Sequence, residues 1–255
     1  MKSISERHLY IKEQLYKNGF VTVQDLAEQL DVTGATIRRD LRIMEKDKLL
    51  RRNHGGASLM HDKLIELSLK DRNMENPQEK EKIARVAASL LTENDSLAVT
   101  SGSTIEAFVR HLQLKGPFKV VTPSIKLGVV LCENQNVDLR ILGGRVNHNS
   151  MSTRDEYTIQ GLNNVRCSKL FFGCGGFSVE DGVTSAIFEE ARLTEAMMNV
   201  CQQRILLADS SKIGKCGFGR ICRMDEIDIL VTDAGINPLV KDRIEALGVE
   251  VIIAE

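Results

Sequence analysis

The chain has 255 residues, enough for one small and one medium-sized domain. Its formal net charge of −1 gives no sign of a nucleic-acid partner, and no apolar run is long enough to span a membrane. Tryptophan is absent and aromatic residues make up 4% of the chain, which argues against a stacking platform for single-stranded nucleic acid.

Charge is unevenly distributed along the chain. Residues 1–60 contain 11 Lys and Arg against 8 Asp and Glu, a net charge of +3, which leaves −4 for the remainder. Within residues 38–54, seven basic residues stand against three acidic ones. A basic footprint confined to one segment is typical of a protein that reads DNA, and it predicts strongly salt-dependent binding.

The six cysteines form no C-x-x-C pair, and no histidine cluster lies near them. The spacing of Cys216 and Cys222 is a weak metal signal. We therefore expect buried free thiols in a reducing cytoplasm, with no metal site and no cofactor. No N-terminal apolar segment resembles a signal peptide, which also favours a cytoplasmic protein.

Two amphipathic helices are expected first. One spans residues 5–18 and ends at Gly19, because glycine commonly terminates helices. The second spans residues 21–32 and has its apolar residues, Leu26 among them, on one face. A short turn then leads to Thr33, as in a helix-turn-helix.

A third helix is predicted from Thr33, whose hydroxyl can accept a hydrogen bond from an early backbone N–H. Ile37, Leu41 and Met44 form its apolar face, so the arginines between them point outward. The small residues 34–36 let the helix N-terminus approach base edges. A strand at residues 48–52 and a tight return at 54–56 would form a basic wing.

Together these elements predict a winged helix-turn-helix. The alternative is an amphipathic helical bundle with a solvated basic face, but the cap, the turn length, the basic stripe and the basic wing all favour DNA binding. The residues expected to contact DNA are Thr33, Gly34, Ala35, Thr36, Arg38, Arg39, Arg42, Arg51, Arg52 and His54.

The N-terminal segment resembles the DNA-binding domain of the DeoR family of bacterial transcriptional regulators. That family has the patterns V-x-V-x-x-L-A, T-I-R-R-D-L-x-x-L-E and R-x-H-G-G-A, and this chain has VTVQDLA, TIRRDLRIME and RRNHGGA. Met44 stands where leucine is usual, a swap that nearly conserves volume.

Beyond the wing, we expect a winged-helix domain over residues 1–58, a polar linker over 59–77 and an α/β domain over 78–255. Helical patterns at 80–91, 103–112, 124–132, 188–202 and 238–247 alternate with short apolar runs. The runs, at 96–100, 118–122, 138–142, 169–173, 204–208, 228–232 and 249–253, do not alternate with polar residues. Such runs predict a mostly parallel sheet covered on both faces.

Ligands of open α/β sheets bind at the carboxyl ends of the strands. The loop TSGST offers Ser101, Gly102, Ser103 and Thr104 to a phosphate, although an ordinary helix cap is the alternative. A turn at Gly143 and Gly144, and a loop with Ser210, Ser211 and Lys212, follow other strands; a plain turn and a solvated lysine are the alternatives there. The glycine-rich loop at 173–185 could close over a ligand.

The second half is similar to the effector domain of DeoR-family regulators, a fold related to ribose-5-phosphate isomerases. Those enzymes carry G-x-G-S-T and A-D-x-S-K loops, and this chain has TSGST and ADSSK at the matching positions. This chain has Thr100 where those regulators usually have aspartate, and NSMSTRDEY where they often have a glycine near Asp155. It also lacks the isomerases' D-G-A-D-E segment, having Gly173–Phe177 instead. Without paired carboxylates we expect no enzyme activity, and we assign Glu189 to hydroxyl binding.

The resemblance implies a repressor of a carbohydrate-metabolism operon, relieved by a phosphorylated sugar bound to Ser101–Thr104, Gly143, Gly144, Glu189 and Lys212. Two alternatives remain: a sugar-phosphate isomerase or deaminase with a fused DNA-binding domain, and a DNA-binding scaffold without a ligand. The expected partners are double-stranded operator DNA and the sugar phosphate, with no membrane. A single winged helix buries little DNA, so we expect a homo-oligomer, dimer or tetramer, held by the α/β domain.

Overall fold

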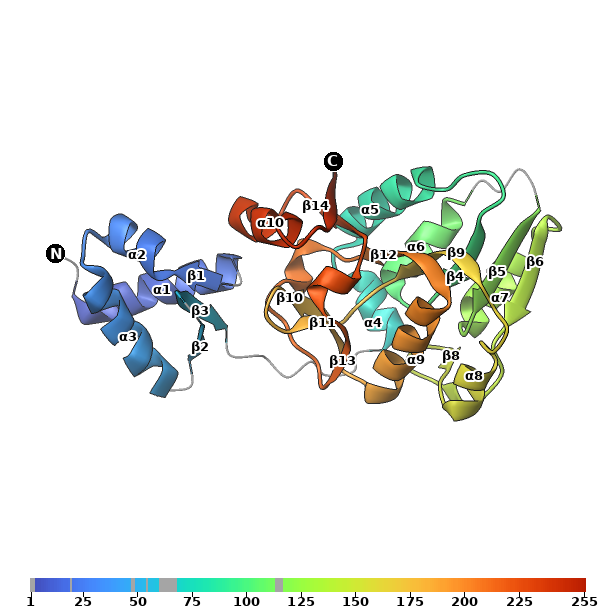
Figure 1. Ribbon diagram of the computed structural model, residues 1–255, viewed down its shortest axis with the longest axis horizontal. Coiled ribbons are helices and arrows are strands. Elements are labelled where there is room, and N and C mark those ends of the chain that lie inside the picture. The colour runs from blue at the N-terminus through green and yellow to red at the C-terminus, as the bar shows by residue number, and fades with distance from the viewer. Residues whose placement is uncertain (1–2, 19, 47–48, 54, 60–67, 113–116) are drawn as a thin grey trace.

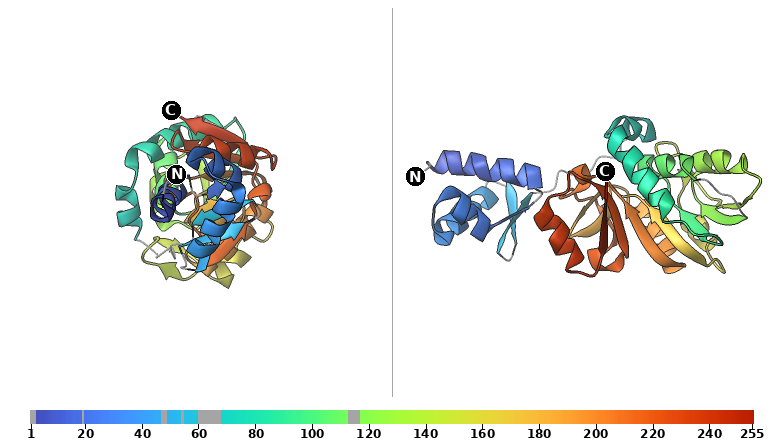
Figure 2. Two further views of the ribbon diagram at one scale, coloured as in Figure 1. Left: turned by 90° about the vertical axis from the view of Figure 1, so that its left-hand side faces the viewer. Right: turned by 90° about the horizontal axis from the view of Figure 1, so that it is seen from above.

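The computed structural model describes residues 3–18, 20–46, 49–53, 55–59, 68–112 and 117–255. A small N-terminal part and a larger α/β part lie end to end along the long axis of the molecule (Figures 1 and 2). Among these residues, no helix is both long enough and apolar enough to cross a membrane.

The N-terminal part consists of three helices and a three-stranded antiparallel sheet of order β1-β3-β2. Its elements are α1 (Ile4–Asn18), β1 (Phe20–Thr22), α2 (Val23–Leu30), α3 (Gly34–Lys46), β2 (Leu50–Asn53) and β3 (Gly56–Leu59). One apolar core joins the three helices and the wing; it includes Ile11, Leu15, Leu26, Ile37, Leu41, Met44 and Leu50. This is the predicted winged helix-turn-helix.

Strand β1 was not expected, because residues 21 and 22 were assigned to the second helix. The helix begins only at Val23, since Thr22 is its N-cap and its hydroxyl accepts a hydrogen bond from the Asp25 N–H at 3.0 Å. The residues before the cap are extended and pair with β3, Val21 facing Ala57.

The segment after the wing contains more structure than a linker. Helix α4 (Leu69–Met74) lies within the range that we assigned to the linker, and it contacts α6 of the α/β part. Helix α5 (Pro77–Ser89) begins before the expected residue 80, because Pro77 occupies its first turn, where proline is tolerated.

The larger part is built on a seven-stranded sheet in which all neighbouring strands are parallel. The strands, each within about three residues of its predicted position, are β4 (Ser96–Val99), β5 (Phe118–Thr122), β6 (Val137–Ile141), β9 (Cys167–Phe172), β12 (Cys201–Leu207), β14 (Ile229–Asp233) and β15 (Glu250–Ala254). Their order is β15-β14-β12-β9-β4-β5-β6, so successive strands progress in opposite directions from the β4–β9 junction. The predicted parallel α/β fold is therefore confirmed.

Helices cover both faces of this sheet (Figure 1). They are α5, α6 (Ser103–Arg110) and α7 (Ile125–Cys132) on one face, and α9 (Phe188–Asn199) and α10 (Pro238–Glu245) on the other. Strand residues alternate between the two cores: Phe171 packs in the first, while Leu170 and Phe172 pack in the second.

Several short elements were not predicted from the sequence. They are β7 (Val146–Asn147), β8 (Ser152–Thr153), α8 (Glu156–Gln160), β10 (Gly176–Ser178), β11 (Gly182–Ser185), β13 (Gly219–Cys222) and the 3-10 turns η1 (Ser210–Lys212) and η2 (Met224–Glu226). Strands β10, β11 and β13 form a second, antiparallel sheet, so most of the glycine-rich segment expected to close over a ligand is a hairpin. Gly182 makes its turn at φ 76°, where a side chain would be strained.

All six cysteines are free thiols, but they are not all buried as expected. Cys132 is exposed because it lies on the outer face of α7, and Cys174 and Cys216 are half-buried. The other three, Cys167, Cys201 and Cys222, are buried in the sheet core.

Candidate nucleic-acid interface and effector pocket

Helix α3 is capped by Thr33, as the sequence predicted. The Thr33 hydroxyl accepts a hydrogen bond from the Thr36 N–H at 3.2 Å, and the Thr36 side chain lies 3.0 Å from the same oxygen. Ala35 is exposed beside them, while Gly34 is half-buried. The start of the helix therefore presents small side chains, which leaves room for a base edge.

The arginines of α3 lie on its outer face. Arg38, Arg39 and Arg42 are all exposed, whereas Ile37, Leu41 and Met44 of the same helix are buried. In the wing, the exposed Arg52 approaches Glu45 at 3.7 Å, and its N–H donates to the same carboxylate at 3.1 Å. The side chain of Arg51 and the whole of His54 lie outside the described residues.

A buried ion pair that the sequence did not reveal holds α3 against α1. Arg7 of α1 contacts both carboxylate oxygens of Asp40, at 2.7 and 3.0 Å, and their side chains are 7% and 3% exposed. The hydrogen bond that Arg7 donates to Asp40 raises the pKa of Arg7 above its ordinary value, although burial opposes the shift. This pair joins α1 to α3, the helix that carries the exposed arginines.

The α/β part encloses a cavity of about 120 Å³ at the carboxyl ends of β4 and β9. These strands are the junction from which the sheet order diverges, the position where open α/β sheets bind ligands. Ser101, Gly102, Ser103, Thr104 and Lys212, all predicted effector contacts, line this cavity.

One end of the pocket is suited to an anion. Gly102 precedes α6 at φ 144°, and no side chain caps the first turn of that helix. The N–H groups of the first turn have no partners within a helix, and the helix dipole places partial positive charge there. The Ser103 and Thr104 side chains line the same corner.

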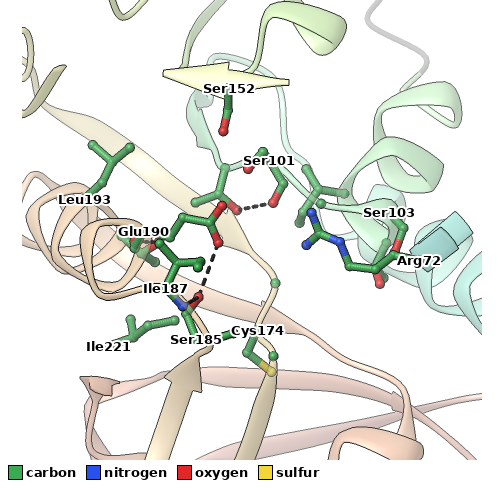
Figure 3. A pocket seen from close by; sticks show the side chains of 18 of the residues that line it. Arg72, Ser101, Ser103, Ser152, Cys174, Ser185, Ile187, Glu190, Leu193 and Ile221 are labelled. Carbon is green, nitrogen blue, oxygen red and sulfur yellow. Dashed lines mark hydrogen bonds between the residues drawn. The ribbon is translucent and has the colours of Figure 1, made fainter. Parts of the chain in front are cut away.

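Arg72 of α4 supplies a guanidinium to this pocket, a group that sequence analysis missed. Its Nε is buried and has no hydrogen-bond partner among the described residues. Figure 3 shows Arg72 and Ser103 on one side of the pocket, with Glu190 and Ser185 on the other. A buried donor without a partner is costly in a folded protein, so this one is available to a ligand.

Lys212 lines the pocket but is not a free charge. Its Nζ lies 3.3 Å from Glu75, between α4 and α5, and its side chain is 15% exposed. Asn76 donates to both Asp209 and Ser211 at 2.9 Å, which fastens the Lys212 loop to the same segment. The loop at the end of β12 is thus bound to the chain that continues from the winged helix.

Lys80 of α5 strengthens this junction. It is buried and donates to the backbone carbonyls of Arg72 and Glu75. Burial lowers the pKa of Lys80 below its ordinary value, with the nearby Asp209 opposing the shift. The position of Arg72 is therefore held by its own backbone, which leaves its side chain for the pocket.

The carboxylate in the pocket is Glu190, and our assignment of Glu189 was wrong. Glu189 is exposed, because successive helix residues differ by about 100° in direction and only one of the two faces inward. Glu190 accepts from the Ser185 hydroxyl at 3.3 Å and lies 3.7 Å from Arg154.

Gly143 and Gly144 also do not line the pocket, contrary to prediction. Gly144, at φ 136°, packs against Asp155, whose carboxylate accepts from the Arg145 and Thr158 N–H groups at 2.9 and 2.8 Å. These hydrogen bonds lower the pKa of Asp155. The glycines therefore serve the turn into β7, and the pocket wall is made by Ser152 and Thr153 of β8.

Comparison with known proteins agrees with both halves of this description. Residues 7–63 match the DeoR-like helix-turn-helix domain, and residues 75–234 match the DeoR C terminal sensor domain. The chain belongs to the DeoR family.

Two DeoR-family relatives are similar over nearly the whole chain. The HTH-type transcriptional regulator GolR of Listeria innocua is 30% identical over 98% of both chains. The HTH-type transcriptional repressor GlcR of Bacillus subtilis is 31% identical over 98% of this chain and 96% of its own. Among solved structures, ribose 5-phosphate isomerase A from Neisseria gonorrhoeae aligns with a TM-score of 0.39 and 19% identity over 53% of each chain.

This DeoR-family protein is a DNA-binding transcriptional regulator. The matched sensor domain begins at residue 75, so α4 and its Arg72 precede it. The structure nevertheless places Arg72 in the cavity of that domain.

Proposed function

We propose that this DeoR-family regulator represses a carbohydrate-metabolism operon and is released from DNA by a phosphorylated sugar. Repression is supported by a relative that is named a repressor and matches almost the entire chain. The observation that carries the ligand assignment is the buried Nε of Arg72, which has no hydrogen-bond partner among the described residues and belongs to the same pocket as the uncapped start of α6.

In this proposal the phosphate lies between Arg72 and the first turn of α6. The backbone N–H groups and the hydroxyls of Ser103 and Thr104 donate to its oxygens, and Lys212 adds positive charge from the opposite loop. Each charge-assisted hydrogen bond contributes about 1.5–3 kcal/mol to binding. A neutral sugar of the same shape lacks these contacts and binds weakly.

The sugar hydroxyls would meet the other end of the pocket. Glu190 accepts hydrogen bonds there. The Thr153 and Ser185 hydroxyls already donate to the Leu142 carbonyl and to Glu190, so they can accept from the sugar, as the Ser152 hydroxyl also can. Arg154, which is not among the residues that line the cavity, lies 3.7 Å from Glu190 and balances its charge.

Ligand and DNA communicate through α4 in this proposal. Phosphate binding draws on Arg72 and Lys212, and both are bound to the segment between α4 and α5. For the ligand to release DNA, it must bind the DNA-free state more tightly, and DNA must weaken ligand binding by the same factor.

The ligand is bound and not converted in this proposal. The loop that follows β9 contributes Gly173, Cys174 and Gly175 to the pocket. Burial raises the pKa of the Cys174 thiol to about 12. A thiol that stays protonated at neutral pH is a poor nucleophile. One carboxylate alone does not provide both the general acid and the general base that isomerisation needs. We further propose that the protein works in the cytoplasm as a homo-oligomer, at least a dimer.

Calorimetry tests the ligand assignment. Aldose and ketose phosphates are titrated into the protein beside the matched dephosphorylated sugars, and the bound ligand is then tested for release of promoter DNA. Equal binding of a sugar and its phosphate would contradict the phosphate site. Conversion of the titrated compound, followed by nuclear magnetic resonance, would instead favour the isomerase or deaminase alternative.

A further inference from the structure

The seven-stranded sheet has two open edges, and they differ in chemistry. Strand β6 ends one side and pairs only with β5 within the described part of the chain; β15 ends the other side and pairs only with β14. An open edge offers unpaired N–H and C=O groups to another strand. The sequence of β6, Val-Asp-Leu-Arg-Ile, contains opposite charges two residues apart.

The backbone of β6 exposes specific groups. Asn136 accepts from the Phe118 N–H at 2.9 Å, and Leu142 donates to the Thr122 carbonyl at 2.9 Å, so the even-numbered residues face β5. Because hydrogen-bonding direction alternates along a strand, Leu139 and Ile141 direct their N–H and C=O groups to the open edge. Val137 directs its carbonyl there, while its N–H donates to Asn134 at 3.0 Å.

We propose that β6 pairs antiparallel with β6 of a second copy of this chain, around a twofold axis at Leu139. In this register the two Leu139 residues exchange hydrogen bonds, and each Ile141 N–H donates to the partner's Val137 carbonyl. Asp138 then stands opposite the partner's Arg140, and Arg140 opposite the partner's Asp138. Both are non-hydrogen-bonded positions, where Cα atoms approach to about 4.5 Å and side chains meet most closely.

Charge makes the edge self-complementary. Asp138 and Arg140 are exposed, and neither has an ion-pair partner among the residues that the structure describes. The twofold axis supplies each with the opposite charge. Pairing of β15 about Ile252 would instead place Glu250 opposite Ala254, with no charge of opposite sign.

The surface beside β6 is apolar. On α7, which packs over β6, Val129 and Val130 are 62% and 41% exposed, and Ile141 of β6 is 46% exposed. A solvated helix carries polar residues at such positions. The twofold axis brings the two copies of α7 onto the same face of one continuous sheet, where these side chains are covered.

The position of β6 also suits a contact between α/β domains. It lies at the end of the molecule opposite the winged helix (Figures 1 and 2), so pairing leaves the arginines of α3 free.

Charge reversal tests this register through the mass of the assembly in light scattering, against the 28.4 kDa of one chain. Asp138→Arg and Arg140→Asp, each alone, place like charges opposite each other and should halve the mass of the wild-type assembly. An equimolar mixture of the two variants makes every facing pair opposite in charge and should restore the mass. The doubly reversed variant, Asp138→Arg with Arg140→Asp, should also restore it.

Glu250→Arg, a charge reversal on the opposite edge strand, is the matched control and should leave the mass unchanged. Recovery in the mixture excludes misfolding as the cause of the loss. The inference rests on the proposed homo-oligomer: a monomeric wild type overturns both. An oligomer whose mass survives both single reversals, or is not restored by mixing, overturns only the β6 pairing.

Discussion

The winged helix and the α/β domain present their charged residues in opposite ways. The arginines of α3 come from one short helix and are exposed, whereas Arg72 and Lys212, far apart in sequence, converge on a buried pocket. DNA is a large, regular polyanion, so a row of exposed basic residues is enough to bind its phosphates. A small ligand must be surrounded, which requires groups from several elements.

The same contrast applies to the buried charges. In the winged helix, the buried Arg7 and Asp40 pair with each other and hold α1 against α3, beneath the exposed arginines. In the α/β domain, the Arg72 Nε is buried with no hydrogen-bond partner among the described residues. Arg7 stabilises the winged helix, whereas Arg72 is a contact of the proposed ligand, so removal of the two arginines should have different consequences.

The largest effect is expected from Asp40→Ala. It removes the carboxylate that contacts the buried Arg7 at 2.7 Å and should destabilise the winged helix by about 3–5 kcal/mol. Hydrogen–deuterium exchange should accelerate in α1 and α3 while the seven-stranded sheet stays protected. Exchange that is unchanged in α1 would show that the pair does not support the domain; replacing Arg7 and Asp40 together by Met and Leu should recover most of the loss.

Arg72→Ala should weaken phosphate-ligand binding by about 1.5–3 kcal/mol, a factor of roughly 10 to 150, because a charge-assisted contact is lost. Promoter affinity without ligand should stay at the wild-type value. Calorimetry and gel shifts measure the two quantities separately. Arg72→Lys is the control that keeps the charge but not the planar donor geometry. A wild-type ligand affinity in the alanine variant would remove Arg72 from the site.

Arg38→Ala should produce the reverse pattern. An arginine that reads a guanine contributes about 1–3 kcal/mol of discrimination at one base pair, so the variant should lose preference there while binding the ligand normally. Arg52→Ala, in the wing, should weaken all sequences alike. Competition assays with single-base operator variants distinguish the two. Uniform weakening by Arg38→Ala would place that residue on the phosphate backbone.

The smallest effect is expected from Asn76→Ala, which removes hydrogen bonds to Asp209 and Ser211. Ligand and DNA should each still bind, but the coupling free energy between them should fall by about 0.5–1.5 kcal/mol in total. The coupling is measured as ligand affinity with and without saturating operator DNA. A wild-type coupling factor would show that the signal does not pass through this junction.

The long elements could be predicted because each carries a strong local pattern. The seven strands are apolar runs, and α3 has both its cap and its apolar face in consecutive residues. The strands that were missed, such as β7 and β8, have two residues each, too few for any periodicity. These two strands pair with each other, and Thr153 of β8 also donates its N–H to the Pro123 carbonyl at 2.9 Å, so they depend on the surrounding fold.

The site was predicted where it follows a strand and missed where it depends on packing. Ser101–Thr104 and Lys212 lie at strand ends, so topology alone brings them together. Glu190 was missed by one residue, since the helix pattern did not fix which of two adjacent glutamates faces inward. Arg72 stands in a polar stretch without a pattern, and only the docking of α4 places it in the pocket.

The position of α4 determines where this protein can be joined to another. A chimaera that grafts a foreign DNA-binding domain at residue 78, where the α/β domain was expected to begin, would discard Arg72 and also Glu75, the partner of Lys212. The graft would fold around a pocket with one wall missing. A junction before Ser68, which caps α4, would keep the whole pocket and join it to the foreign DNA-binding domain.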